Sequence, residues 1–407
     1  MKPSTPLVFG ILASSHGKPS DAVWLPEPRL CRELSLASVA AGVETYVFSA
    51  ADYKPGASSI LGLQYVGGEW VRRLVPLPDI VYDRSFYRSA EARRAAAHAL
   101  AKLKEQRRFQ LLNSKLPGKL SVHHALAGDA ALAPYLPRTV LYSERGLREL
   151  LHAAGGDGLV LKPAAGMQGR GIVRIMLGAC DDKPVANGRT RSNRPFQQTF
   201  AGTAELTHWL RRFMGRSAYL VQPCLRLRDG FHRPFDIRVL MQKDGSGEWK
   251  LTGMAARRGG EESLTSNLHG GGEALPAHTL LTENFGKLEA ERLRKEIHTI
   301  SGHTAKRLET SFGRFGELAF DCGIEPSGKL WLLEANSKPG RDAFRQIGDE
   351  TAQRLSIQRP LRYARYIMHR AAPTFVSAEF AYDLVQPERP VAITAGQRSS
   401  NVQEVHR

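Results

Sequence analysis

The chain has 407 residues, 42% of them hydrophobic, so it is long enough for two or three domains with ordinary cores. No stretch approaches the roughly 20 apolar residues of a membrane-spanning helix. The apolar run 7–13 is broken at once by the polar residues 14–17, and we interpret it as a first strand rather than as a signal peptide. We expect a globular, cytoplasmic protein without a membrane span.

The formal net charge is +17, and a basic field of this size attracts nucleic acids, anionic polymers or nucleotides. The basic residues are scattered over the whole chain, with one concentration at 88–108, and they do not alternate with aromatic residues as in single-stranded nucleic-acid binders. We therefore favour a solvated surface with affinity for acidic partners over nucleic-acid binding. The four cysteines are far apart and form no CxxC pair, which argues against a zinc site and a disulfide framework.

The first part of the chain consists of short apolar runs separated by turn residues. These runs predict strands at 7–12, 44–48 and 80–82, with a helix at 29–41 after the first strand. Strand, helix and strand in this order are typical of an α/β unit with a parallel sheet. The alanine-rich stretch 90–109 carries charges at helical spacing and predicts a long surface helix.

The middle of the chain, from about 120 to 240, alternates predicted helices and strands. The strands that we expect there lie at 158–163, 171–176 and 218–221. The polar segment 180–196 predicts an exposed hairpin or loop between them.

Beyond residue 237 the pattern changes to hairpins. The turn 244–247, Asp-Gly-Ser-Gly, predicts the pairing of strands 238–243 and 249–255. A glycine-rich polar segment follows at 261–273, and then a long amphipathic helix at 284–312.

A glycine-rich loop follows the predicted strand that ends in Lys162. Glycines at 166, 169 and 171 allow the backbone to approach a polyanion, and Lys162 supplies a point charge for a phosphate. The Gly-Lys-Ser/Thr ending of a Walker A loop is missing and the next segment is a strand, so we expect the loop to cover the phosphates as a hairpin lid. A purely structural glycine turn is the alternative.

Two further strands carry candidate ligands. The strand that ends at Gln222 could offer its backbone to an adenine edge, although an ordinary strand end is the alternative. Asp236 and Arg238 lie two residues apart and so share a face, where a surface ion pair of little energetic value is the default interpretation. Arg238, Arg257 and Asn267 are the donor types that neutralise a γ-phosphate and an acyl phosphate. No histidine lies next to a nucleophile, so histidine catalysis is not supported.

The most informative pattern lies near the C-terminus, where two apolar strands carry hard oxygen ligands. Residues 316–321 are interpreted as a strand that ends at Asp321, and 330–337 as a second strand that ends at Glu334 and Asn336. The turn 325–329 makes the two strands a plausible hairpin. The three side chains then suit Mg²⁺ held against nucleotide phosphates. Two amphipathic strands with polar ends are the alternative.

Taken in order, these motifs resemble the ATP-grasp superfamily and, within it, the YheC/YheD family linked to the endospore coat. The similarity extends from about 113 to 344. The matching residues are Leu161-Lys162-Pro163, Gly169-Arg170-Gly171, Gln222, Phe235-Asp236-Ile237-Arg238-Val239, Asn267-Leu268, Gly271-Gly272, Asp321 and Leu333-Glu334-Ala335-Asn336-Ser337-Lys338-Pro339-Gly340.

The resemblance implies a fold class of α/β and α+β type. An N-terminal α/β (pre-ATP-grasp) domain at 1–112 would precede an ATP-grasp domain of two α+β subdomains at 113–372. The lid would lie at 164–172, and 373–407 would be an irregular tail.

The resemblance also assigns roles to residues. Lys119 and Lys162 would contact the phosphates of ATP, the chain around Gln222 would hold adenine, and Arg238, Arg257 and Asn267 would act in catalysis. The lid residues would be Gly166, Gln168, Gly169 and Gly171. The ligands of one or two Mg²⁺ ions would be Asp321, Glu334 and Asn336. Two neighbours, Lys115 and Arg258, leave open which lysine and which arginine reach ATP.

The family's reaction pattern implies that a carboxylate attacks the γ-phosphate of ATP and that an amine captures the acyl phosphate. The basic charge hints at an acidic polymer or peptide as partner, and the family adds spore coat proteins as partners and the spore coat as a second location beside the cytoplasm. A non-catalytic, nucleotide-binding structural protein of the coat is the alternative to a ligase.

Overall fold

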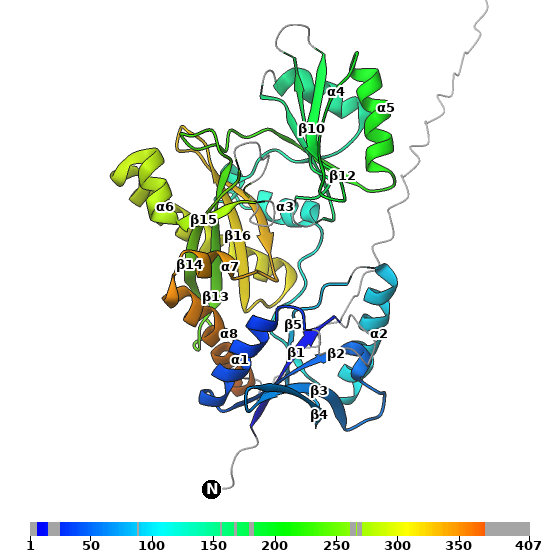
Figure 1. Ribbon diagram of the computed structural model, residues 1–407, viewed down its shortest axis with the longest axis vertical. Helices are drawn as coiled ribbons and strands as arrows, with labels where there is room; N and C mark the ends of the chain where they lie inside the picture. Colours follow the sequence, from blue (N-terminus) through cyan, green and yellow to red (C-terminus); the bar gives the residue numbers. More distant parts are fainter. Residues whose placement is uncertain are drawn as a thin grey trace, which may run out of the picture. The chain divides into compact units, whose positions relative to one another are not determined.

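The structure is a computed structural model that describes residues 6–14, 25–87, 89–154, 157–166, 169–178, 183–260, 266 and 271–370. Three sheets organise this part of the chain (Figure 1). The first is mostly parallel and the other two are antiparallel. Of the described helices, none combines the length and apolar character that a membrane span requires.

The first sheet has the order β4-β3-β2-β1-β5-β6, in which β1 runs parallel to both β2 and β5. Alternate residues of β1 face two different cores. Phe9 and Ile11 pack with helices α1 and α8, whereas Val8 and Leu12 pack with α2. The elements are β1 (Leu7–Ala13), α1 (Pro28–Ala40), β2 (Val43–Ser49), η1 (Ala50–Asp52), β3 (Ser59–Val66), β4 (Glu69–Pro76), β5 (Ile80–Asp83), α2 (Ala90–Gln106) and β6 (Gln110–Leu111).

The second sheet has the order β11-β10-β9-β8-β12-β7 and packs against α4 and α5 (Figure 1). The segment predicted as a hairpin or loop at 180–196 contains, in its described part, the strand β10 and the start of β11. The elements are α3 (Lys119–Ala127), η2 (Ala133–Tyr135), β7 (Val140–Leu141), α4 (Glu144–Ala154), β8 (Leu159–Pro163), β9 (Val173–Leu177), β10 (Pro184–Arg189), β11 (Pro195–Thr199), α5 (Thr203–Met214) and β12 (Tyr219–Pro223).

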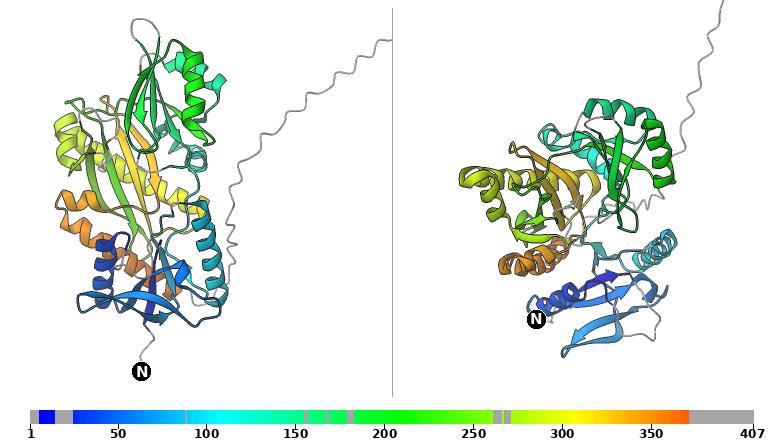
Figure 2. Two further views of the ribbon diagram at one scale, coloured as in Figure 1. Left: turned by 45° about the vertical axis from the view of Figure 1, so that its right-hand side comes forward. Right: turned by 45° about the horizontal axis from the view of Figure 1, so that its top comes forward.

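The third sheet has the order β15-β14-β13-β16-β17 and is covered on both faces (Figure 2). Helix α6 packs on one face, and α7 with the start of α8 packs on the other. The elements are β13 (Phe235–Lys243), β14 (Trp249–Arg258), β15 (Glu273–Pro276), α6 (Ala277–Phe312), β16 (Glu317–Ile324), β17 (Leu330–Asn336), α7 (Asp342–Gln346) and α8 (Glu350–Arg370).

The described architecture has the expected class, an N-terminal α/β part followed by two parts of α+β type. Three details differ from the sequence analysis. The hairpin of β3 and β4 was not predicted, although Gly67-Gly68 marks its turn. The helix predicted at 284–312 begins earlier, at Ala277, and is interrupted at Gly286, whose φ of 78° and ψ of 164° are not helical.

A third difference concerns Asp321, which does not end its strand. Strand β16 continues to Ile324, and all of its residues are buried. In an antiparallel hairpin, the end of the first strand lies beside the start of the second. A carboxylate at the end of β16 would therefore lie beside Leu330, whereas the observed position pairs Asp321 with Glu334.

Gly158, just before β8, is a position where the second sheet requires glycine. Its φ is +77°, and an added Cβ would lie 2.2 Å from the carbonyl oxygen of Ile175 on β9. We expect Gly158→Ala to lower the free energy of unfolding by roughly 2–5 kcal/mol, from backbone strain together with overpacking, in a denaturant titration. Gly42→Ala is the control, since Gly42 also has a positive φ but no neighbour within 4 Å. An equal loss in both variants would contradict the role of the close contact.

Candidate active site

A pocket lies where α3, β8 and β12 meet β17. It contains about 550 Å³ of space, a figure that includes the part open to solvent. Lys119 and His123 line it from α3, Lys162 from β8, Gln222 from β12 and Glu334 from β17. Four of these five residues are predicted site residues, so the structure brings together side chains that lie far apart in the sequence.

Two lysines and one glutamate are among the side chains that line this pocket. The ammonium group of Lys119 lies 3.3 Å from Oε2 of Glu334. Burial, together with repulsion from Lys119, lowers the pKa of Lys162 to about 8, although attraction to Glu334 opposes the shift. Two lysines against one carboxylate form a site that an anion would stabilise. The exposed Lys115 is not among the residues that line the pocket.

Much of the remaining lining of the pocket is apolar, with Gln222 and Thr139 among its polar side chains. The side-chain amide of Gln222 donates to Oγ1 of Thr139 at 2.6 Å. The apolar wall consists of Val122, Leu126, Leu136, Leu220, Leu332 and Leu333. A flat aromatic group fits such surroundings, with its polar edge directed at the backbone near Gln222.

The glycine loop connects β8 and β9, which are antiparallel, so the predicted lid is a hairpin connection. Its first residues lie next to α3, because the backbone N–H of Lys119 donates to Ala164 O at 3.4 Å. Gly169 and Gly171 have positive φ values of 71° and 75°. A Cβ at Gly171 would lie 2.9 Å from the hydroxyl of Tyr219, so a larger residue would displace the loop. Gln168 lies outside the described residues.

A second cluster of charged side chains lies on the third sheet around Asp321. This residue is only 8% exposed. Arg238 donates from Nε to Oδ1 at 2.6 Å and from Nη2 to Oδ2 at 3.1 Å, and Arg257 Nη2 lies 3.0 Å from Oδ2. Burial by itself would raise the pKa of Asp321, but the two guanidinium groups outweigh it and hold that pKa below its ordinary value. Asp321 is therefore ionised and held between two cations.

Asp236 does not form the expected surface pair with Arg238. It is buried, and it pairs with Arg257 across the neighbouring strand, with Nε to Oδ1 at 2.7 Å. Its other oxygen accepts from Ser266 Oγ at 2.6 Å. The surface interpretation was wrong because both faces of this sheet are covered. Asn267, the residue after Ser266, lies outside the described residues.

The neighbouring Arg258 has different partners from Arg257. Its Nε lies 2.7 Å from Oδ2 of Asp229, and its Nη2 lies 3.4 Å from Oε2 of Glu283. These contacts tie the loop before β13 to α6. The geometry therefore places Arg257 in the Asp321 cluster and gives Arg258 a role in packing.

A β-bulge brings the two clusters together. Cys322 pairs with Leu332, but the preceding residue, Asp321, pairs with Glu334, so Leu333 is an extra residue in β17. Because side chains alternate along a strand, this extra residue turns Glu334 to the face of Asp321. Asn336 lies two residues further on, opposite Ala319, and shares that face.

The donor set fits a hard divalent cation only with additional oxygens. Among the described residues, no group of three or more His, Cys, Asp or Glu is arranged to hold a metal ion. Asp321 and Glu334 supply carboxylates and Asn336 an amide oxygen. Mg²⁺ is commonly held by one or two carboxylates together with substrate phosphates and water. These side chains therefore fit Mg²⁺ in company with a nucleotide.

The sequence analysis missed two polar residues of the pocket, His123 and Thr139. His123 lies one helical turn after Lys119, a spacing that could have revealed it. Its pKa is lowered by burial and then by repulsion from His124 and Lys162. Thr139 reaches the pocket only because it precedes β7, and no local pattern indicates that position.

Fold and site together define a protein of the ATP-grasp class. The family described as "YheC/D like ATP-grasp" matches residues 108–367, and the chain belongs to it. The endospore coat-associated protein YheC of Bacillus subtilis (strain 168) is 28% identical over 331 residues, 80% of this chain and 88% of that protein. The endospore coat-associated protein YheD of the same organism is 29% identical over 334 residues, 81% and 72% of the two chains.

Among solved structures, the fold is similar to that of the D-cycloserine synthetase DcsG, with a TM-score of 0.52. The alignment covers 89% of this chain and 99% of that one at 14% sequence identity. At this identity the likeness concerns the fold alone.

The charge balance of the pocket leads to a prediction about Lys162. Its pKa, about 8, is below the ordinary value of 10.5, so the folded state binds fewer protons than the unfolded state between those values. The stability that depends on this group therefore rises as the pH increases from about 8 to 10.5. Without nucleotide or metal, we expect Lys162→Met to raise the thermal unfolding midpoint at pH 7 and to remove this rise.

Lys183→Met is the control, since Lys183 does not line the pocket. The measurement is the unfolding midpoint at a series of pH values from 7 to 10.5. A Lys162→Met protein that is less stable than the wild type at pH 7 would contradict the account.

Proposed function

We propose that this protein is an ATP- and Mg²⁺-dependent carboxylate–amine ligase. The observation that carries the proposal is the row of Arg238, Asp321 and Glu334 across β13, β16 and β17, which lies beside a pocket with two lysines. A scaffold with a purely structural role has no need of charged groups of both signs in covered positions, because apolar side chains of similar volume are often as stabilising.

ATP would occupy the pocket. Lys119 and Lys162 would bind its phosphates, and this would relieve the repulsion that lowers the pKa of Lys162. Gly166, Gln168, Gly169 and Gly171 would cover the phosphates as a lid. Adenine would lie against apolar side chains of the lining, beside Gln222.

Asp321, Glu334 and Asn336 would hold Mg²⁺, which when bound would neutralise phosphate charge. To bind the cation, Asp321 would give up contacts that it now makes with Arg238 and Arg257. The two guanidinium groups would then become available to the substrate. Both arginines start within 3.1 Å of Asp321, close to where the charge would develop. Electrostatic positioning of this kind is the main contribution to phosphoryl transfer.

The reaction would proceed in two steps. An oxygen of the substrate carboxylate forms a bond to the γ-phosphorus of ATP, and the bond from that phosphorus to the leaving oxygen of ADP breaks. An amine then attacks the acyl carbon, phosphate leaves, and the amine nitrogen gives a proton to solvent as the amide forms. Arg238, Arg257 and Asn267 would stabilise the negative charge that moves during both steps.

The charge of the chain and the names of its relatives bear on the substrates and the location. The charge of +17 favours an acidic polymer or peptide as a substrate. The names of the two curated relatives connect them with the endospore coat. We propose that this protein acts in the cytoplasm of sporulating cells or on proteins of the spore coat.

The test is ADP release from Mg-ATP by the purified protein, with and without an extract of sporulating cells. We expect the extract to stimulate release by the wild type. We expect Glu334→Gln to reduce that release by more than the roughly 10–100-fold that changes next to a metal ligand cause. Glu325→Gln, at the turn of the same hairpin, is the matched control and should behave like the wild type.

Two outcomes would overturn the ligase assignment. Equal ADP release by Glu334→Gln and the wild type would show that the proposed metal ligand has no role. Mg-ATP binding without ADP release in any extract would favour the alternative, a nucleotide-binding structural protein of the coat.

A further inference from the structure

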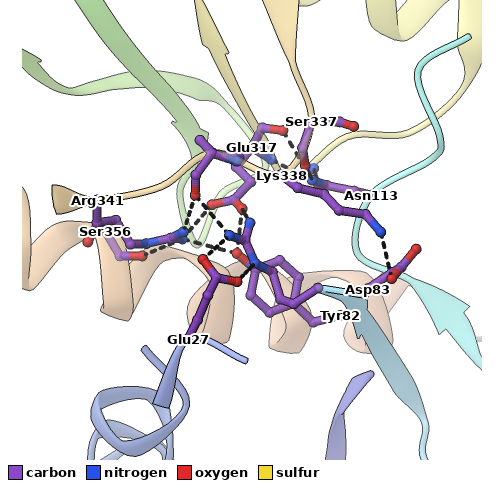
Figure 3. Close-up of polar contacts among 12 residues, drawn as sticks. Glu27, Tyr82, Asp83, Asn113, Glu317, Ser337, Lys338, Arg341 and Ser356 are labelled. Carbon is purple, nitrogen blue, oxygen red and sulfur yellow. Dashed lines mark hydrogen bonds and ion pairs between the residues drawn. The ribbon is translucent and has the colours of Figure 1, made fainter. Parts of the chain in front are cut away.

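A fully buried carboxylate, Glu317, begins the strand that carries Asp321 four residues later. Its Oε1 accepts from the hydroxyl of Tyr82, and its Oε2 accepts from Arg341 Nη2 at 2.7 Å (Figure 3). Its Oε1 also lies 3.4 Å from Arg84 Nη1, and its Oε2 also accepts from Gln242 Nε2 at 2.9 Å. Tyr82 lies in β5 of the first sheet, and Arg84 directly follows the carboxyl end of that strand. They are separated from Glu317 by 235 and 233 residues in the sequence. The contacts therefore join the first sheet to β16 of the third.

The two arginines also hold one backbone carbonyl. Arg84 Nη2 donates to Pro339 O at 3.0 Å, and Arg341 Nη1 donates to the same oxygen at 2.9 Å. Arg84 in addition binds both carboxylate oxygens of Glu27, just before α1, at 2.5 and 2.8 Å. The planar fork of Arg84 thus serves three partners at once, which a lysine ammonium could not reproduce.

The two residues before Pro339 are held in the same way. Asn113, which follows β6, donates to Ser337 O at 2.7 Å. The ammonium group of Lys338 donates to Ser85 O at 2.7 Å and lies 2.8 Å from Oδ1 of Asp83 at the end of β5 (Figure 3). Each residue of the segment 337–339 is therefore fixed by a group at the carboxyl ends of the first sheet's parallel strands or by Arg341.

The segment 337–339 continues directly from Glu334 and Asn336, the ligands proposed for Mg²⁺. A buried charged network of this size carries a desolvation cost that apolar packing would avoid, so its benefit is a defined geometry rather than stability. The geometry that it defines is the path of the backbone immediately after the ligands. Groups that orient ligands from outside the coordination sphere commonly change metal affinity.

We propose that Arg84 and Lys338 are positioning residues, through which the N-terminal sheet sets the affinity of the Glu334–Asn336 motif for Mg²⁺ in the presence of nucleotide. The inference rests on the proposed function. It makes the N-terminal sheet part of the metal and nucleotide site, beyond any contribution to substrate binding.

The test measures the Mg²⁺ concentration that gives half-maximal binding of a non-hydrolysable ATP analogue, by calorimetry on the full chain. Arg84→Lys keeps the charge that Glu27 and Glu317 need but loses the fork that reaches Pro339 O. Lys338→Met should fold normally, because Asp83 keeps two hydrogen bonds from Ser85 and is partly exposed. We expect each variant to raise the half-saturating Mg²⁺ concentration at least about tenfold. The analogue's affinity without Mg²⁺ should not change.

The control is Lys243→Met. Lys243 lies at the far end of β13, and the change removes its largely buried ion pair with Glu309 of α6. It should lower the thermal unfolding midpoint and leave the Mg²⁺ dependence unchanged, so general destabilisation is separated from positioning. If Lys338→Met folds and keeps the wild-type Mg²⁺ dependence, this inference is wrong and the proposed function is unaffected. A wild type that shows no Mg²⁺-dependent binding of the analogue would overturn the proposed function and this inference together.

Discussion

The extra residue in β17 is the constraint on which the site depends. Without Leu333 as a bulge, Glu334 and Asn336 would point to the same face as Leu332, into the apolar core under α6. With the bulge, both side chains share a face with Asp321 and its two arginines. One backbone irregularity therefore converts an ordinary hairpin into a row of charged groups.

Charge balance explains how such a row is tolerated inside a covered sheet. Asp321 and Asp236 together face Arg238 and Arg257, so the cluster on β13, β14 and β16 is neutral. The pocket beside it is not balanced, since Lys119 and Lys162 share one carboxylate. A bound polyanion would supply negative charge to the two lysines, and a divalent cation bound with it would replace the arginines as the partner of Asp321. Binding of both ligands would thus be coupled through Asp321 and Glu334.

Local patterns predicted much of this arrangement. The apolar runs and turns placed most strands within a few residues, and Asp-Gly-Ser-Gly predicted the hairpin of β13 and β14. The polar residues at strand ends identified Lys162, Gln222 and Glu334, which the structure brings to one pocket. The strand and hairpin predictions succeeded because each depends on a short stretch of sequence.

Other features could not be read from the sequence because they depend on distant partners. Alternation gives the face of a side chain only until a bulge intervenes, so the orientation of Glu334 could not be derived. Glu317 in an apolar strand indicates a buried partner, but nothing local identifies Arg84 or Tyr82. Helix α8 likewise packs its Ile357 and Leu361 into the core of the first sheet, although it is the last helix that the structure describes.

The most direct test of the account is the position of the metal. Crystals grown with Mn²⁺ and a non-hydrolysable ATP analogue would locate it by anomalous scattering. The account predicts a peak coordinated by Asp321, Glu334, Asn336 and phosphate oxygens, with Asp321 no longer bound to both arginines. A nucleotide bound elsewhere, or a nucleotide in the pocket with Asp321 still held by Arg238 and Arg257 and no metal beside it, would contradict the account.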